Sequence, residues 1–221
     1  MIPPTRTDFE AAVVAALADP PPSWVVAVAG VAGPAAVVGD DRRRYPLASV
    51  TKVLTSLSLW LALEECSVAL EDPAGPEGST LAHLLAHASG LPLEGDTPIA
   101  PPGVRRIYSN TGFETAGRHL AERTGLDVAT YLREGFCQPL GLVDTQLLHS
   151  PAWGATSTAA DLIALGRQLL APSLLDPETV ARGCAVAFDG LDGVLPGYGR
   201  RVPNPWGLGV EVRGTKHPHW T

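Results

Sequence analysis

The segment covering residues 46–66, PLASVTKVLTSLSLWLALEEC, constrains the fold most because it reads as one long apolar helix. Residues 53–63 are aliphatic residues, a tryptophan and small hydroxyls, so such a helix must be buried on most sides. Its one cation, Lys52, stands in the first turn, and no carboxylate follows before Glu64, about three turns later. The helix dipole and burial both disfavour a positive charge there. This lysine therefore needs a chemical reason.

Ser49 supplies a candidate reason, because it precedes Lys52 by three residues. Positions three apart share a helix face, with Cβ atoms about 5–6 Å apart, so the amine can reach the hydroxyl. A serine is a weak nucleophile until a base takes its proton, and a desolvated lysine has a lowered pKa that suits this task. The alternative is that Ser49 only caps the helix. A capping box would then place Glu or Gln where this sequence has Lys52.

A second candidate pair, Tyr108 and Asn110, lies in the stretch PPGVRRIYSNTGFE. In an extended chain, residues two apart point to the same side. A phenol can take part in proton transfer, and an amide can hold a substrate carbonyl. Taken alone, the pair is better explained as a buried aromatic residue followed by a turn asparagine.

Together these motifs resemble the serine β-lactamase and penicillin-binding-protein superfamily, in its branch of class C β-lactamases, family VIII-type esterases and D-alanyl-D-alanine carboxypeptidases. LASVTK is similar to the Ser-x-x-Lys motif of that superfamily, and YSN to its Tyr-x-Asn motif. LLAHASGL, PLGLVDT and GATSTAADLIALG are similar to further stretches of the family, in the same order and spacing. The resemblance covers residues 24–209.

The resemblance implies a serine hydrolase that works by acyl transfer through a covalent serine ester. Ser49 would attack a small-molecule ester, β-lactam or D-amino-acid peptide, assisted by Lys52 and Tyr108, while Asn110 helps to place the substrate. The backbone N–H of Ser49 would be one donor of the oxyanion hole. No metal or organic cofactor is expected.

The resemblance also implies an α+β fold, with an antiparallel sheet flanked by helices and packed by the Ser49 helix. We expect residues 1–69 to belong to the α/β subdomain, 70–195 to form a mainly helical subdomain, and 196–221 to return toward the sheet incompletely. The active site should lie between the two subdomains. Residue patterns predict strands within 24–30, 35–49 and 206–214, and helices at 8–18, 81–87, 111–125, 129–141 and 157–172. Thr111 with Glu114, and Thr158 with Asp161, are the predicted capping pairs.

The sequence departs from the family at its end. The third family motif, Lys/His-x-Gly, follows a segment like WGLGVEVRG, but here the sequence stops at TKHPHWT before such a triplet. We therefore expect that the C-terminal strands and helix of the family are missing and that the chain is truncated. The strands within 24–39 would then keep an open edge and an uncovered apolar face. The alternative function is a catalytically inactive or ligand-binding member of the same fold.

Composition and the remaining motifs exclude several other classes. The net charge is −7, and the only basic cluster is the arginine run 42–44, which argues against a nucleic-acid partner. No signal peptide and no membrane-spanning run is recognised, so a cytoplasmic protein is expected. The sequence contains neither the Gly-x-Ser-x-Gly elbow of α/β-hydrolases nor a phosphate-binding loop. The sequence gives no indication of oligomeric state.

Histidine and cysteine residues give no sign of a metal or disulfide framework. His83 and His87 stand four apart on a short predicted helix, but no nearby third ligand completes a metal site. The three cysteines are widely spaced, and Cys66 is expected to be a small buried hydrophobic residue. Three tryptophans could border a substrate cleft, but packing in the core explains them better: Trp153, Trp206 and Trp220.

Overall fold

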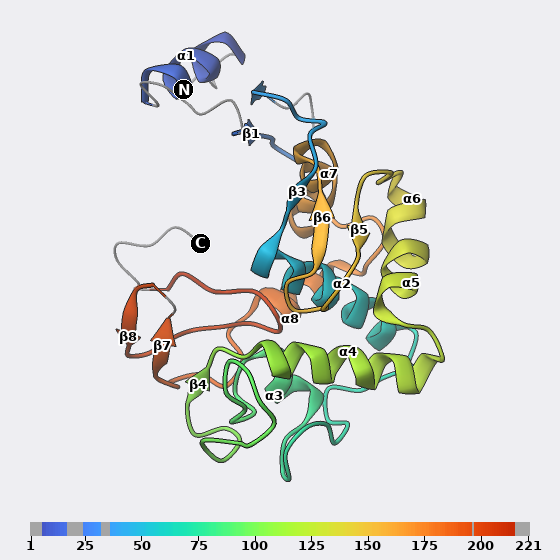
Figure 1. Cartoon of the computed structure of the whole chain (residues 1–221), viewed down its shortest axis with the longest axis vertical. Helices are drawn as coiled ribbons and strands as arrows, with labels where there is room; N and C mark the ends of the chain where they lie inside the picture. The colour runs from blue at the N-terminus through green and yellow to red at the C-terminus, as the bar shows by residue number, and fades with distance from the viewer. Residues whose placement is uncertain (1–5, 17–23, 32–35, 196, 215–221) are drawn as a thin grey trace.

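Helix α2 (Thr51–Glu64) runs through the centre of the hydrophobic core, as the apolar segment predicts. It contacts α4 (Asn110–Thr124), α5 (Val128–Leu132) and α8 (Pro177–Cys184), which cover it on different sides (Figure 1). The structure is a computed structural model that describes residues 6–16, 24–31, 36–195 and 197–214. Without these neighbouring helices the apolar side chains of α2 would be exposed to water, so α2 is stable only inside this shell.

The other helices of the described residues lie around this core, except the N-terminal helix, which packs against an N-terminal strand. They are α1 (Arg6–Ala16), α3 (Leu81–Leu85), α6 (Gln138–Leu140) and α7 (Ala159–Leu170), with a 3₁₀ turn at Ala48–Val50 and a π-helical turn at Arg133–Cys137. Among the described residues, no helix combines the length and the apolar character needed to cross a membrane.

Among the described residues, the strands form three small sheets, mostly antiparallel, which agrees with the predicted α+β class. Strand β1 (Val26–Val28) pairs with β2 (Ala36–Val38), and β6 (Ala155–Ser157) lies between β3 (Tyr45–Pro46) and β5 (Gln146–Leu147). These pairings are antiparallel. The third sheet has the order β4 (Arg106–Ile107), β7 (Gly193–Leu195), β8 (Gly199–Arg201), and its β4–β7 pairing is parallel. The fold is therefore α+β, with short strands distributed among helices.

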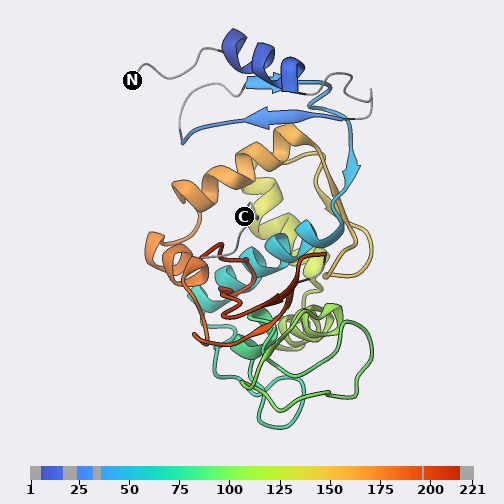
Figure 2. The same ribbon diagram turned by 90° about the vertical axis from the view of Figure 1, so that its left-hand side faces the viewer.

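The first two strands and α1 form what we call the N-terminal lobe. Figure 2 shows α1, the β1–β2 pair and α7 as successive layers at one end of the molecule, and contacts join α1 to β2 and β1 to α7. The pair has no third strand among the described residues, and the side chains of Trp24 and Val28 are 52% and 54% exposed. Helices α1 and α7 pack against this pair, so the predicted uncovered apolar face is not seen, and the prediction that further strands are missing stays a prediction.

The helix ends show which capping predictions were right. Thr158 caps α7 as predicted by accepting a hydrogen bond from the backbone N–H of Asp161. The capping box at Thr111 is wrong, because Ser109 is the N-cap of α4 and accepts from the Gly112 N–H at 2.8 Å. The carboxylate of Glu114 instead accepts a hydrogen bond from Ser150.

Other predictions need correction at particular positions. The segment 206–214 is no strand, because only an isolated bridge joins Trp206 to Glu211. Cys66 is exposed, because it lies just beyond the end of α2 and its backbone has a positive φ of 57°. The carboxylate of Asp161 accepts from Thr145 and does not close the cap of α7. The segment TKHPHWT, which includes Trp220, lies outside the described residues.

Candidate active site

Ser49 lies in the 3₁₀ turn directly before α2, on an exposed stretch of backbone. The residue before it, Ala48, has a φ of +45°, a conformation that L-residues with a side chain rarely adopt. Such strain costs on the order of 1–3 kcal/mol and is found where surrounding structure fixes a functional group. Here it turns the chain sharply between β3 and α2 and presents the serine at the helix N-terminus.

The first turns of α2 are fixed by hydrogen bonds to the segment 151–155. The Thr51 hydroxyl accepts from the Ala155 N–H at 3.0 Å, and the Thr55 hydroxyl donates to the Pro151 carbonyl at 2.7 Å. The Leu47 N–H also donates to the Ala155 carbonyl at 2.9 Å. Both sides of Ser49 are thus tied to the same segment, which limits how far its hydroxyl can move.

Lys52 directs its amine at three oxygen atoms inside the molecule. Its Nζ lies 2.7 Å from Asn110 Oδ1, 3.0 Å from the Ala152 carbonyl and 3.4 Å from Ser49 Oγ. The residue is only 3% exposed. No carboxylate of the described residues pairs with it as a salt bridge. The helix therefore holds a buried amine that is solvated by neutral oxygens.

Burial has a direct effect on the proton affinity of this amine. Desolvation lowers the pKa of Lys52 to about 8, while the charges of Glu94 and Glu114 work weakly in the opposite direction. An ordinary lysine keeps its proton far above neutrality. Near neutral pH, Lys52 is therefore neutral in an appreciable fraction of molecules and can accept a proton.

Tyr108 follows β4, and His87 holds the backbone on both sides of it. The Ile107 N–H donates to the His87 carbonyl at 2.8 Å, and the Ser109 N–H donates to His87 Nδ1 at 3.1 Å. The two rings stack with centroids 4.5 Å apart, and Trp206 contacts both rings edge-on. His87 is 1% exposed, so this support is part of the core.

The environment of His87 keeps its ring neutral. Desolvation by burial, followed by the nearby charges of Lys52 and Arg106, lowers the pKa of His87 well below its ordinary value. Because Nδ1 accepts the bond from Ser109, the ring proton is on Nε2. His87 is therefore a fixed aromatic support for Tyr108 and carries no charge at neutral pH.

The phenol of Tyr108 stays protonated at neutral pH. Burial raises its pKa, and Glu211 raises it further, while hydrogen bonding with the Ser49 side chain partly opposes the shift. The Lys52 amine lies 4.6 Å from the centre of the Tyr108 ring. A phenol in this position can donate or relay a proton, but it is a poor source of phenolate.

The four side chains predicted from the sequence are thus brought together. Ser49 and Lys52 come from the start of α2, and Tyr108 and Asn110 come from the junction between β4 and α4. A hydroxyl, a desolvated amine and a phenol in mutual contact are the groups that nucleophilic acyl transfer requires. Three further groups in the site were not predicted from the sequence: the ring of His87, the carboxylate of Glu94 and the carbonyl of Ala152. Of these, only His87 lies in a segment that resembles the family, LLAHASGL, where its spacing from His83 suggested a metal pair instead of a support for Tyr108.

The histidines have other partners in the structure. His83 Nδ1 lies 2.9 Å from the Thr80 hydroxyl and takes part in the cap of α3, while His87 binds the Ser109 N–H. Within the described ranges, no cluster of three or more His, Cys, Asp or Glu side chains could hold a metal ion.

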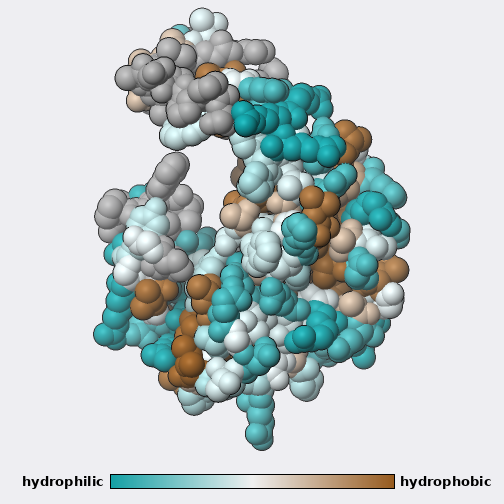
Figure 3. Space-filling view, in the orientation of Figure 1, coloured by the Kyte–Doolittle hydropathy of each residue, from teal (hydrophilic) through white to brown (hydrophobic). Residues whose placement is uncertain are grey.

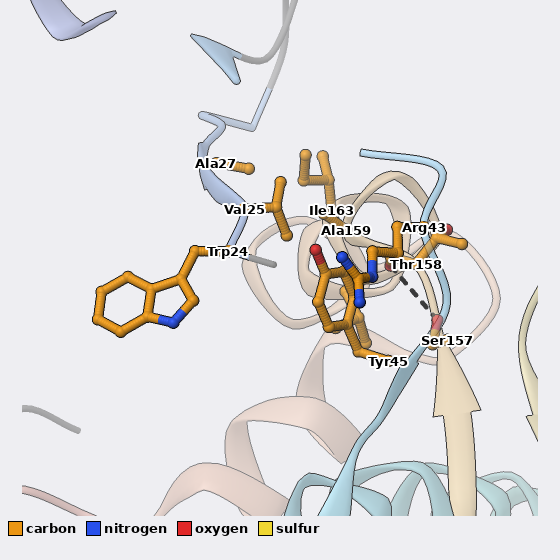
Figure 4. A pocket seen from close by; sticks show the side chains of 10 residues that line it. Trp24, Val25, Ala27, Arg43, Tyr45, Ser157, Thr158, Ala159 and Ile163 are labelled. Carbon is orange, nitrogen blue, oxygen red and sulfur yellow. Dashed lines mark hydrogen bonds between the residues drawn. The ribbon is translucent and has the colours of Figure 1, made fainter. Parts of the chain in front are cut away.

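Two cavities lie near this region. A cavity of about 750 Å³ between β1 and α7 is lined by residues such as Val25, Tyr45 and Ile163, and Figure 4 shows Trp24 turned away from the other side chains. It contains neither Ser49 nor Lys52. A second cavity, of about 580 Å³, has Tyr108 in its wall, and exposed apolar residues gather over β4 and β7 beside it (Figure 3). The chemistry therefore points to the Ser49 region and not to the larger cavity.

Comparison with known proteins identifies the family of the chain. The model of the Beta-lactamase family matches residues 9–220, so the chain belongs to the beta-lactamase family. The structure of a beta-lactamase from Mycobacterium bovis is 49% identical, with a TM-score of 0.82, over 84% of this chain and 70% of that one. A D-stereospecific amidohydrolase from Streptomyces sp. is 21% identical and shares the fold, with a TM-score of 0.72 over 93% of this chain and 82% of its own.

A curated relative is more distant and longer. The D-alanyl-D-alanine-carboxypeptidase/endopeptidase AmpH of Escherichia coli is 29% identical over 142 residues. The match covers 48% of this chain and 37% of AmpH, so the chain spans well under half of that relative.

Proposed function

We propose that this protein is a serine hydrolase that transfers an acyl group to Ser49 and then to water. The observation that carries the proposal is the buried amine of Lys52, 3.4 Å from Ser49 Oγ, with a pKa lowered to about 8. A lysine without an ion pair in an apolar helix costs stability. A role as the base for the neighbouring serine explains why the chain keeps it.

The proposed reaction begins with proton transfer from the Ser49 hydroxyl to the neutral amine of Lys52. The serine oxygen then attacks the substrate carbonyl, and the oxyanion that forms accepts a hydrogen bond from the Ser49 backbone N–H. Tyr108 lies against both groups as a protonated phenol, so it can pass the proton on to the leaving group. In the second half of the reaction, a water molecule would give a proton to Lys52 and attack the acyl carbonyl, and the bond to Ser49 Oγ would break as the serine oxygen takes the proton back.

Asn110 would place the substrate. Its Oδ1 accepts from Lys52, and its Nδ2 carries two hydrogens, one of which goes to Glu94. The other is available to a carbonyl oxygen of the substrate. Amide bonds flanking the scissile carbonyl would be recognised in this way.

The substrate class proposed is an ester, a β-lactam or a D-amino-acid peptide. The names of the relatives support this range, since they include a beta-lactamase, a D-stereospecific amidohydrolase and a D-alanyl-D-alanine-carboxypeptidase/endopeptidase. All three classes present a carbonyl that a serine can attack.

Covalent labelling tests the proposal. A fluorophosphonate or a fluorescent penicillin should add its mass to the peptide that contains Ser49, and Ser49→Ala should abolish the adduct. Ser56→Ala is a matched control, because Ser56 lies on the same helix but donates to the Lys52 carbonyl inside it. Adduct formation that persists in Ser49→Ala contradicts the assignment. Reversible binding of the penicillin without any adduct would instead favour a ligand-binding protein without catalysis.

A further inference from the structure

Glu94 lies at the edge of the candidate site, at the end of a chain of polar contacts. Its Oε1 accepts a hydrogen bond from Asn110 Nδ2 at 2.6 Å. The backbone of the same loop holds the start of α4, because the Asn110 N–H donates to the Leu93 carbonyl at 2.9 Å. The loop therefore contacts Asn110 through both its backbone and a carboxylate side chain.

This carboxylate determines which way round the Asn110 amide sits. An ionised carboxylate can only accept hydrogen bonds, so the group facing Glu94 must be the amide NH₂. The amide oxygen is then left facing Lys52, at 2.7 Å from Nζ. With a neutral partner in place of Glu94, the amide could turn over and present its NH₂ to the lysine.

The orientation of Asn110 in turn determines where Lys52 sends its hydrogens. A neutral amine has two hydrogens and one lone pair, and Lys52 has three oxygen neighbours. The Asn110 and Ala152 oxygens are both carbonyl oxygens, which accept and never donate. They take the two hydrogens, and the lone pair is left for the third neighbour, the hydroxyl of Ser49.

We propose that Glu94 is a positioning residue that sets the direction of this hydrogen-bond chain, so that the lone pair of Lys52 faces Ser49. The inference rests on the function proposed above and adds a residue that belongs to neither of the two motifs. Glu94 acts through Asn110 and Lys52 and does not touch the reacting atoms.

The charges around Lys52 make the effect of Glu94 measurable. Tyr108 and His87 face the amine as neutral rings, and Glu94 and Glu114 are the carboxylates that raise its pKa against the effect of burial. Removing the charge of Glu94 should lower the pKa of Lys52 further. The pH at which Ser49 becomes reactive should then also fall.

The test compares Glu94→Gln and Glu94→Ala with Asp96→Asn, using the rate of Ser49 labelling by a fluorophosphonate across pH. Asp96→Asn removes the same charge two residues away, from an exposed side chain outside the contacts of Lys52. We expect both Glu94 variants to react about tenfold more slowly at the plateau, the scale of one charge-assisted hydrogen bond. Their acid limb should move to lower pH, and Asp96→Asn should match the wild type.

Two results would overturn the inference. In the first, both Glu94 variants keep the plateau rate and the midpoint of the wild type. In the second, Asp96→Asn shifts the pH profile as far as the Glu94 variants do, which would mean that the effect does not depend on which of the two charges is removed. Unchanged melting temperatures would show that the variants are folded. Either result leaves the proposed function standing, because that function is tested separately by whether the wild type forms an adduct and Ser49→Ala does not.

Discussion

The region around α2 and the N-terminal lobe differ in how completely their residues are buried. Every residue of the buried hydrophobic cluster lies between Leu47 and Leu208, and ten of the 14 residues of α2 are buried. In the lobe, the residues of β1 and β2 are half-buried or exposed, and the half-exposed side chain of Trp24 is turned away from the other side chains that line the nearby cavity (Figure 4). One region can support a costly buried amine, and the other contributes little to the core.

This difference explains where the chemistry is. Desolvation of Lys52 requires a rigid apolar shell, because water that entered would restore an ordinary pKa. The shell comes from α2, α4 and the segment 151–155, all within the well-packed region. The lobe contacts that region mainly through α7, so its loosening should leave the site intact.

Among the variants that test this difference between the two regions, Lys52→Met should have the largest effect on the rate of Ser49 labelling. Loss of the base should slow Ser49 labelling by about 10²–10⁴-fold. The melting temperature should not fall, because an apolar side chain of similar length replaces a buried amine without an ion pair. Labelling kinetics and thermal unfolding measure the two effects. A lower melting temperature with unchanged labelling would mean that Lys52 is structural.

A pair of truncations compares packing in the two regions. Leu57→Ala, at a residue that is fully buried in α2, should cost about 2–5 kcal/mol of unfolding free energy. Val37→Ala, in the half-buried strand β2, should cost less than about 1 kcal/mol. Chemical denaturation gives both values. Equal costs would show that the lobe is packed as tightly as the core.

Two glycines on helices should respond with opposite signs. Gly183→Ala on α8 should destabilise by about 1–3 kcal/mol, because the new Cβ would lie 2.2 Å from the ring of Trp60. Gly166→Ala on α7 should stabilise by up to about 1 kcal/mol, since nothing lies within 4 Å of its Cβ position. Thermal unfolding measures the change in stability of both variants. A change of the same sign in both would contradict the packing described here.

The parts of the molecule that follow from local rules could be predicted from the sequence. The apolar run gave α2, and the spacing of three residues placed Lys52 next to Ser49. Helix α8 was not predicted, although Asp176 and Pro177 at its start are a helix-start signal that the sequence contains.

Other parts depend on contacts between distant residues. Strands of two or three residues, such as β4, β7 and β8, are too short to show alternation. The Ala152 carbonyl that binds Lys52 is 100 residues away in the chain, and any residue type could supply it. Glu94 likewise sits in a turn-rich loop, where a glutamate looks like an ordinary surface residue. Such partners become visible only when the chain is folded.

The pH dependence of Ser49 labelling tests the central claim most directly. If the desolvated amine of Lys52 is the base, the rate should rise with pH and reach half its maximum near pH 8, where the amine loses its proton. The residual rate of Lys52→Met should lack this rise. A wild-type rate that is constant from about pH 6 to about pH 9 would contradict the account, as would the same profile in both proteins.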